Sequence, residues 1–133
     1  MKFNLPLYVM LPRKTIKDKK FILNLNTYRN THQMILGQAK HIYADIVKEI
    51  APPAHFNCAK VTMTYYHGNK RRVDKSNPLS VIEKFMCDAL TDIGYWEDDD
   101  SMHVPITVFK WGGVDKDNPR CEVEINEIVK PEA

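Results

Sequence analysis

Two short segments of the chain hold the residues best suited to chemistry. In "RRVDKSNPL", residues 71–79, Asp74 follows Arg71 and Arg72, and in "YWEDDDS", residues 95–101, four acids stand in a row. Carboxylate oxygens are the ligands that hard cations such as Mg²⁺ prefer, and arginines contact phosphate groups. Together these residue types predict a site where carboxylates hold a cation beside a bound phosphate.

The helix expected between these segments limits how they can meet. Asn77 suits the N-cap, Pro78 suits the first helical position, and Gly94 suits the termination of the helix. About sixteen helical residues span ~24 Å, whereas the link from Gly94 to Asp99 reaches back only ~17 Å. Asp74 and Asp99 can therefore share a cation only if the chain turns sharply at Gly94, or if the site is completed across a dimer interface.

Each of these groups also has an ordinary structural interpretation. Asp74 can cap the turn before the helix, and the acids at 97–100 can form a solvated loop. Tyr95 and Trp96 can stack on a splayed base, but a buried aromatic plug after the helix is the favoured interpretation. The basic residues 70–72 have the strongest functional claim, because phosphate contacts dominate nucleic-acid affinity.

Charge is distributed unevenly along the chain. The formal net charge is +2, yet residues 1–44 carry eight Lys or Arg and a single acid, and residues 67–75 add four Lys or Arg and a histidine around one acid. The acids are concentrated in residues 88–100. This asymmetry suits a polyanion bound partly through an acid-held cation, and a solvated surface of uneven charge is the plainer alternative.

Length and composition indicate one globular domain covering residues 1–133. The chain is 44% hydrophobic and 27% charged, as in ordinary globular proteins. It has no apolar run long enough to span a bilayer, and prolines interrupt its first segment, so neither a membrane anchor nor a signal peptide is expected. Cys58, Cys87 and Cys121 lack metal-type spacing and are expected to be reduced, buried thiols of a cytoplasmic protein.

Hydrophobic periodicity predicts an α+β fold, a mixed β-sheet with two main helices packed on it. A first helix is expected from Thr31, as its N-cap, to Ile50, where two prolines follow. Its apolar residues at helical spacing are Met34, Ile35, Ala39, Ile42, Ile46 and Ile50. Strands are expected at 3–9, at 57–66, and as a C-terminal pair at 103–111 and 120–129, with a basic hairpin at 14–26 around residues 17–19.

The second helix is the clearest element of the sequence. Its apolar face comprises Val81, Ile82, Phe85, Met86, Ala89, Leu90 and Ile93. Lys84, Asp88 and Asp92 follow one another at four-residue spacing on the opposite face. A surface ion pair between Lys84 and Asp88 is the ordinary role of that lysine.

The segment from Arg71 to Ser101 resembles the RusA family of Holliday-junction resolvases, phage-type members especially. That family shows an arginine, Asp-x-Asp-Asn, a helix with a lysine, "DAL", a glycine–aromatic break and paired aspartates. The matching residues, in about a quarter of the chain, are Arg72, "DKSN" at 74–77, Lys84, "DAL" at 88–90, "GYW" at 94–96 and "DD" at 98–99. The early segment "LNTYRN" at 25–30 also looks like an Asn/Arg segment of the family.

The resemblance implies a homodimeric, Mg²⁺-dependent endonuclease that makes paired nicks in four-way DNA junctions and leaves 5′-phosphates. It implies that Asp74 and Asp99 bind the metal, with Asp98 beside them, and that Lys84 stabilises charge on the scissile phosphate. Ser76 stands where the family has its second metal-binding aspartate, and a hydroxyl is a weaker ligand than a carboxylate. Either Asp98 or Asp100 compensates for it, or the protein is a catalytically impaired, junction-binding protein of the same fold.

The basic trio beside the expected metal site and the motif resemblance together indicate which residues contact DNA. They are Lys70, Arg71, Arg72 and Asn77 around the first carboxylate, and Asn26 and Arg29 of the early segment. A third interpretation, from charge alone, is a protein-interaction domain whose acidic patch binds a basic partner.

Overall fold

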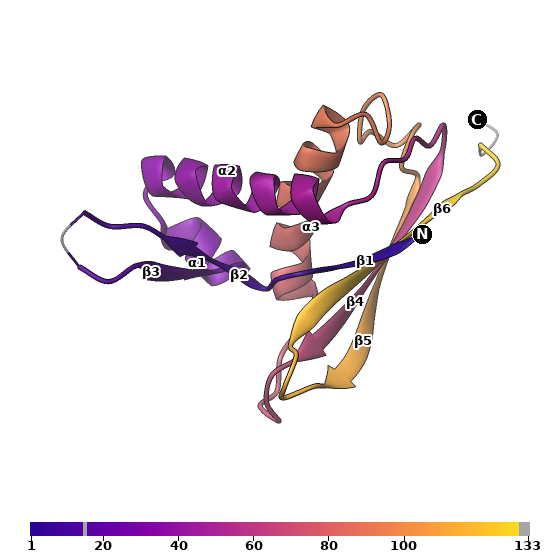
Figure 1. The fold of residues 1–133 in the computed structure, drawn as a ribbon. Helices are drawn as coiled ribbons and strands as arrows, with labels where there is room; N and C mark the ends of the chain where they lie inside the picture. The colour runs from indigo at the N-terminus through magenta and orange to yellow at the C-terminus, as the bar shows by residue number, and fades with distance from the viewer. Residues whose placement is uncertain (15, 131–133) are drawn as a thin grey trace.

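A mixed four-stranded sheet forms one layer of the fold. The computed structural model describes residues 1–14 and 16–130. The sheet has the order β1 (Lys2–Leu5), β6 (Arg120–Glu127), β4 (Ala59–His67) and β5 (Ile106–Val114) (Figure 1). β4 runs parallel to β5 and antiparallel to β6, and β1 pairs antiparallel with β6.

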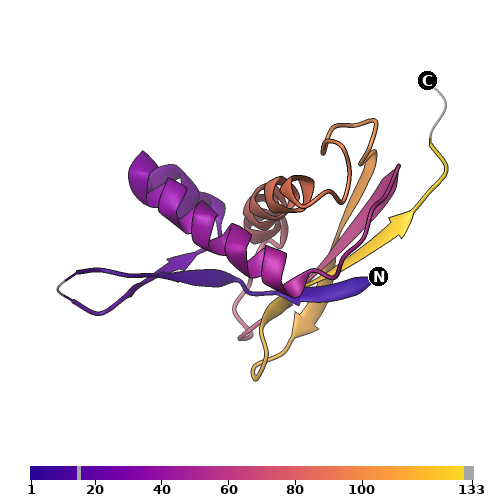
Figure 2. The same ribbon diagram turned by 45° about the horizontal axis from the view of Figure 1, so that its top comes forward.

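Helices form the second layer, on one side of this sheet. α2 (Gln33–Ile50) and α3 (Ser76–Asp92) are the two main helices, and the short helix α1 (Leu25–Asn30) precedes α2. Figure 2 shows α2 and α3 on the same side of the sheet. A separate hairpin of β2 (Tyr8–Leu11) and β3 (Lys19–Ile22) extends away from the sheet beneath α2 (Figure 1). This arrangement confirms the predicted single α+β domain with a mixed sheet and two main helices.

The predicted apolar face of α3 is confirmed. Its residues from Val81 to Leu90 on that face are each at most 2% exposed, and only the terminal Ile93, at 40%, is not buried. The predicted start was wrong, because the helix begins at Ser76 and Asn77 is not its N-cap. Pro78 is then the third helical residue, still within the turn whose N–H groups lack intrahelical acceptors, so it is tolerated there.

The predicted first helix is confirmed to its end at Ile50, but its predicted start at Thr31 was wrong. Thr31 ends α1, and the N-cap of α2 is His32, whose Nδ1 accepts the Met34 N–H at 3.2 Å. The buried residues of α2 are Ala39, Tyr43 and Val47, whereas Met34 is 79% exposed. Tyr43 can be buried because its hydroxyl donates a hydrogen bond to the Pro6 carbonyl.

The N-terminal strands differ from the prediction because Pro6 has no N–H to donate. The expected strand at 3–9 is divided at Pro6 into β1 and β2, which belong to different sheets. β3 pairs with β2. The predicted hairpin instead began at residue 14, so its first strand was wrong. Residues 17 and 18 lie in the connection, as expected, and residue 15 lies outside the described residues.

The C-terminal strands are not paired with each other, contrary to prediction. β4 lies between β5 and β6, and the connection at 115–119 passes its end. A strand, helix and strand in the order β4, α3, β5 form a crossover unit, which places β5 parallel beside β4. β6 then pairs with the other edge of β4, where its alternating residues Cys121, Val123 and Ile125 are buried.

The cysteines are free and buried, as predicted. Burial is the main cause that raises the pKa of the Cys121 thiol to about 12, and burial also raises the pKa of Cys87. Among the described residues, each helix is too short or too polar to cross a membrane.

Candidate functional site

The acid segment is placed by a sharp turn at the end of α3. The Gly94 N–H donates to the Thr91 carbonyl at 3.1 Å, and the Tyr95 N–H donates to the Leu90 carbonyl at 3.0 Å. This is a Schellman motif, and Gly94 adopts the left-handed conformation it requires, with φ +85°. The prediction that Gly94 terminates the helix is confirmed, and the sharp turn that convergence would require is present there.

Two aromatic side chains hold the chain in this reversed direction. Tyr95 is 0% exposed and Trp96 is 1% exposed, which confirms the predicted buried plug. The Trp96 indole N–H donates to Thr91 Oγ1 at 2.8 Å, and the Tyr95 hydroxyl donates to the Pro52 carbonyl. The acids that follow are thereby directed back along α3.

Asp99 returns to the middle of α3 and lines a pocket of about 360 Å³, here called the α2–α3 pocket. Its charged lining residues are Lys40, Lys84, Asp88 and Asp99. Lys40 comes from α2, and its ammonium lies 2.6 Å from Asp88 Oδ2. The structure therefore joins Asp99 and Lys84, fifteen residues apart in the sequence, and adds Lys40 and Asp88 to them.

The surroundings of Asp99 disfavour its ionised form. Burial is the main cause that raises the pKa of Asp99, followed by its hydrogen bond with Asp98 and the negative charge of Asp88. Burial also raises the pKa of Glu83, to which Asp99 contributes repulsion. Ionised carboxylates that repel each other in this way are stabilised by a cation between them.

The other two aspartates of the acid run have different surroundings. Asp98 Oδ1 accepts the N–H of Asp99 at 2.8 Å, and Asp98 does not line the α2–α3 pocket. Asp100 Oδ1 accepts N–H bonds from Met102 and His103 and lies 2.7 Å from the His103 ring, the contact that chiefly lowers the Asp100 pKa. Asp100 therefore closes the turn after the acid run.

The first predicted carboxylate lies at the N-terminal end of α3. Asp74 lines a second pocket of about 370 Å³, here called the β4–α3 pocket, together with Asn26, Arg72 and Asn77. Four of the residues predicted to bind metal or DNA are thus gathered in one place. Tyr65, His67 and Asn24 also line it and had not been predicted.

Within this second pocket the polar side chains also stabilise the fold. Asp74 Oδ1 accepts the Ser76 N–H at 3.0 Å, as in the turn-capping role considered for it. Asn77 Oδ1 accepts the Leu25 N–H at 2.8 Å and so links α3 to α1. Both side chains have a structural function in addition to any contact with a ligand.

Asp74 and Asp99 line different pockets within one chain. Asp74 lies just before the first turn of α3, whereas Asp99 lies beside Lys84 and Asp88, roughly 12–18 Å further along the helix at ~1.5 Å per residue. Ser76, the first residue of α3, lines neither pocket. Within residues 1–14 and 16–130, no group of three or more His, Cys, Asp or Glu side chains is placed so that it could hold a metal ion. Convergence of Asp74 with Asp99 therefore stays a prediction about two copies of the chain.

The donor set of the α2–α3 pocket fits Mg²⁺ in its usual protein environment. Mg²⁺ prefers oxygen ligands and is commonly held by one or two carboxylates, with water and substrate phosphates completing its shell. Asp88 and Asp99 supply two carboxylates from separate segments in one pocket. Because Lys40 neutralises Asp88 in part, Asp99 is the principal candidate ligand.

Sequence reasoning missed Lys40 and Asp88 as site residues. Asp88 did carry a signal, because it begins the "DAL" match and follows Lys84 by one helical turn. Lys40 carried none, since its position depends on how α2 packs against α3. The remaining predicted residues, Arg29, Lys70 and Arg71, are exposed.

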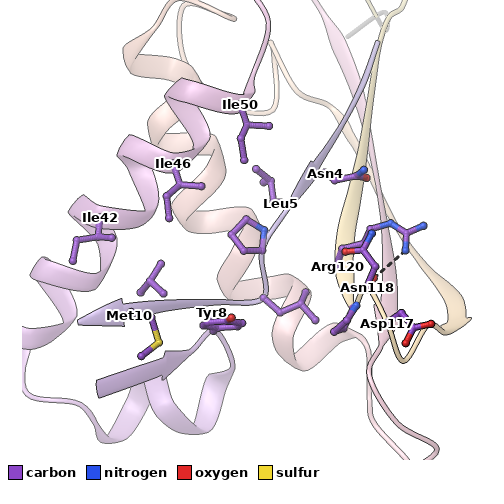
Figure 3. A pocket seen from close by; sticks show the side chains of 14 residues that line it. Asn4, Leu5, Tyr8, Met10, Ile42, Ile46, Ile50, Asp117, Asn118 and Arg120 are labelled. Carbon is purple, nitrogen blue, oxygen red and sulfur yellow. Dashed lines mark hydrogen bonds between the residues drawn. The ribbon is translucent and has the colours of Figure 1, made fainter. Parts of the chain in front are cut away.

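A larger pocket lies away from these residues. It measures about 720 Å³ and is lined by apolar side chains of α2 and the first two strands, with the 117–120 segment at one side (Figure 3). Ile42, Ile46 and Ile50 point into it, which explains why these apolar residues of α2 are not fully buried. None of the predicted site residues lines this pocket.

A scan of the chain against models of known protein families finds no match. A search of curated proteins finds no match either.

Proposed function

We propose that the protein is a Mg²⁺-dependent endodeoxyribonuclease that nicks branched DNA, four-way junctions in particular, and acts as a homodimer in the cytoplasm. The observation that supports this proposal best is the meeting of Asp99, Lys84 and Asp88 in the α2–α3 pocket. Asp99 and Lys84 are the late carboxylate and the helix lysine of the motif resemblance. The fold brings together two residues that the same motif resemblance selected at distant positions, as a shared catalytic role requires.

Each side chain of the pocket has a distinct role in this proposal. Asp99 and Asp88 would hold Mg²⁺, which when bound polarises a phosphate and stabilises a leaving oxygen. Lys84 directs its ammonium to the scissile phosphate, and Lys40 holds Asp88 in position through the 2.6 Å ion pair. Arg72 and the exposed residues Lys70 and Arg71 contact the DNA backbone. A two-fold dimer provides the two related sites that paired nicks need.

Cleavage of a synthetic four-way junction tests the proposal directly. We expect nicks at symmetric positions with Mg²⁺ and none with EDTA, and an intact duplex of the same sequence should be cleaved far less. Light scattering of the same sample should give the mass of a dimer. A protein that binds neither junction nor duplex would overturn the proposal in favour of an interaction domain with a protein partner.

A DNA-binding protein without catalysis is the second candidate. It is favoured by Ser76, which removes one expected carboxylate, and by the hydrogen bond that engages Asp74 in a turn. Tight junction binding without nicking at any Mg²⁺ concentration would support this candidate over the nuclease.

Replacement of Lys70, Arg71 and Arg72 together by alanine should weaken binding to every DNA sequence. For each phosphate that the protein no longer neutralises, the slope of log affinity against log salt should fall by about one unit. The salt dependence of junction binding, measured by anisotropy, checks this expectation. A matched control replaces Lys14, Lys116 and Lys130, which are exposed lysines outside both pockets. If both triple variants lost the same affinity, residues 70–72 would not form a specific DNA-binding surface.

A further inference from the structure

Trp111 is a large aromatic side chain that the fold leaves in contact with solvent. It lies on β5, an edge strand of the sheet, and is 48% exposed, whereas Trp96 is 1% exposed. An indole carries a large apolar surface whose exposure to water is unfavourable, so an exposed one beside other rings is a candidate binding surface.

Two further rings stand beside Trp111 on the same face of the sheet. Tyr65 and His67 are two residues apart on β4, so they share a face, and Tyr65 is the register partner of Trp111. The Trp111 ring centroid lies 6.1 Å from that of Tyr65 and 6.3 Å from that of His67. The Tyr65 hydroxyl and His67 Nδ1 are 2.9 Å apart, which fixes both rings.

Basic side chains adjoin this aromatic cluster. Tyr65 and His67 line the β4–α3 pocket together with Arg72, so the rings continue directly into a pocket that holds a guanidinium. Lys70 and Arg71, in the exposed segment before Arg72, extend the positive charge. Asp74 is the acid that lines this pocket, and the turn already uses its Oδ1 as an acceptor.

We propose that Trp111 is a stacking site for an unpaired base, and that Arg72 binds a phosphate of the same strand. The inference rests on the proposed nucleic-acid function and adds the part of the substrate that is recognised, a single-stranded or unstacked nucleotide. Base–aromatic stacking is sequence-tolerant, because every base has a π-face, and it is commonly combined with a basic groove. The adjacency of the rings to Arg72 favours a nucleotide over a second copy of the chain on the β5 edge.

Tryptophan fluorescence tests the stacking site without metal or cleavage. In EDTA, a short oligothymidylate should quench the wild-type emission and protect it from acrylamide. In Trp111→Phe the remaining buried Trp96 should show neither effect. A fluorescein-labelled oligothymidylate should bind Trp111→Ala about 5-fold to 150-fold more weakly, the range for loss of one base stack. Trp111→Phe should keep part of the affinity.

Ile106→Ala is the matched control, because Ile106 lies at the far end of the same edge strand and is 41% exposed. It should bind the oligonucleotide as the wild type does. Suppose that the oligonucleotide does not quench the wild type and that Trp111→Ala binds it with unchanged affinity. If the protein still nicks junctions, the stacking site is overturned and the nuclease proposal stands. Quenching without nicking would support the stacking site and overturn the nuclease. A change from dimer to monomer in Trp111→Ala, without quenching in the wild type, would instead assign Trp111 to a contact between copies.

Discussion

Asp99→Asn should abolish the nicking of four-way junctions and leave junction binding in place. Loss of groups that only orient metal ligands typically costs 10- to 100-fold, so loss of the principal carboxylate ligand should exceed about 100-fold. Asp92→Asn is the control, because Asp92 also lies on α3 but pairs with Lys48 at 3.4 Å outside the pocket. Cleavage rates at saturating Mg²⁺ measure the difference.

The stability of Asp99→Asn separates removal of a metal ligand from disruption of the fold. Burial and neighbouring negative charge raise the pKa of Asp99, so its ionised form destabilises the folded chain. That cost is absent below the ordinary pKa of an aspartate and is complete once the pH exceeds the raised value. The melting temperature of the variant, relative to the wild type, should therefore rise from acidic to neutral pH. If the folded Asp99→Asn variant nicked junctions at the wild-type rate, Asp99 would not be a ligand of the catalytic metal.

Trp96→Ala should lower the free energy of unfolding by about 3–5 kcal/mol, the usual cost of truncating a fully buried aromatic residue. Its indole is 1% exposed, and it also donates the hydrogen bond to Thr91 that holds the turn after α3. Stabilities of domains are typically about 5–15 kcal/mol, so this one change removes a large share. Urea denaturation followed by circular dichroism measures it.

Trp111→Ala is the internal comparison for this effect, because its indole is half exposed. It should change the free energy of unfolding by less than about 1 kcal/mol. A similar decrease for both tryptophans would mean that the exposed one is packed in the native protein. A decrease below about 1 kcal/mol for Trp96→Ala would show that the acid segment is not held by the aromatic plug.

The sequence predicted best those elements whose pattern is local. The apolar stripe of α3, its end at Gly94 and the buried Tyr95–Trp96 pair all depend on neighbours within a few residues. The local pattern does not determine which N–H group Asn77 caps. Asn77 could cap its own helix, but in the structure it accepts a hydrogen bond from Leu25 in a distant segment. Local pattern does not distinguish these partners.

The pairing of strands and the composition of the site depended on distant contacts. The hydrophobic alternation of residues 120–127 gives the same signal whether β6 pairs with β5 or with β4, and only the crossover through α3 decides between them. Lys40 reaches Asp88 because α2 packs against α3, an interaction that no short motif encodes. Asp99 and Lys84 were identified together through motif resemblance, and the turn at Gly94 supplies the geometry that brings them into one pocket.

Alkylation of the three buried thiols can report transient local unfolding of the chain. Only the thiolate reacts readily with an alkylating reagent, and burial suppresses that form in Cys87 of α3 and Cys121 of β6. Reaction at either site must therefore await local exposure to solvent. Mass spectrometry of slowly alkylated native protein would time the opening of the helix and of the central sheet separately, and added junction DNA would show which of the two it protects.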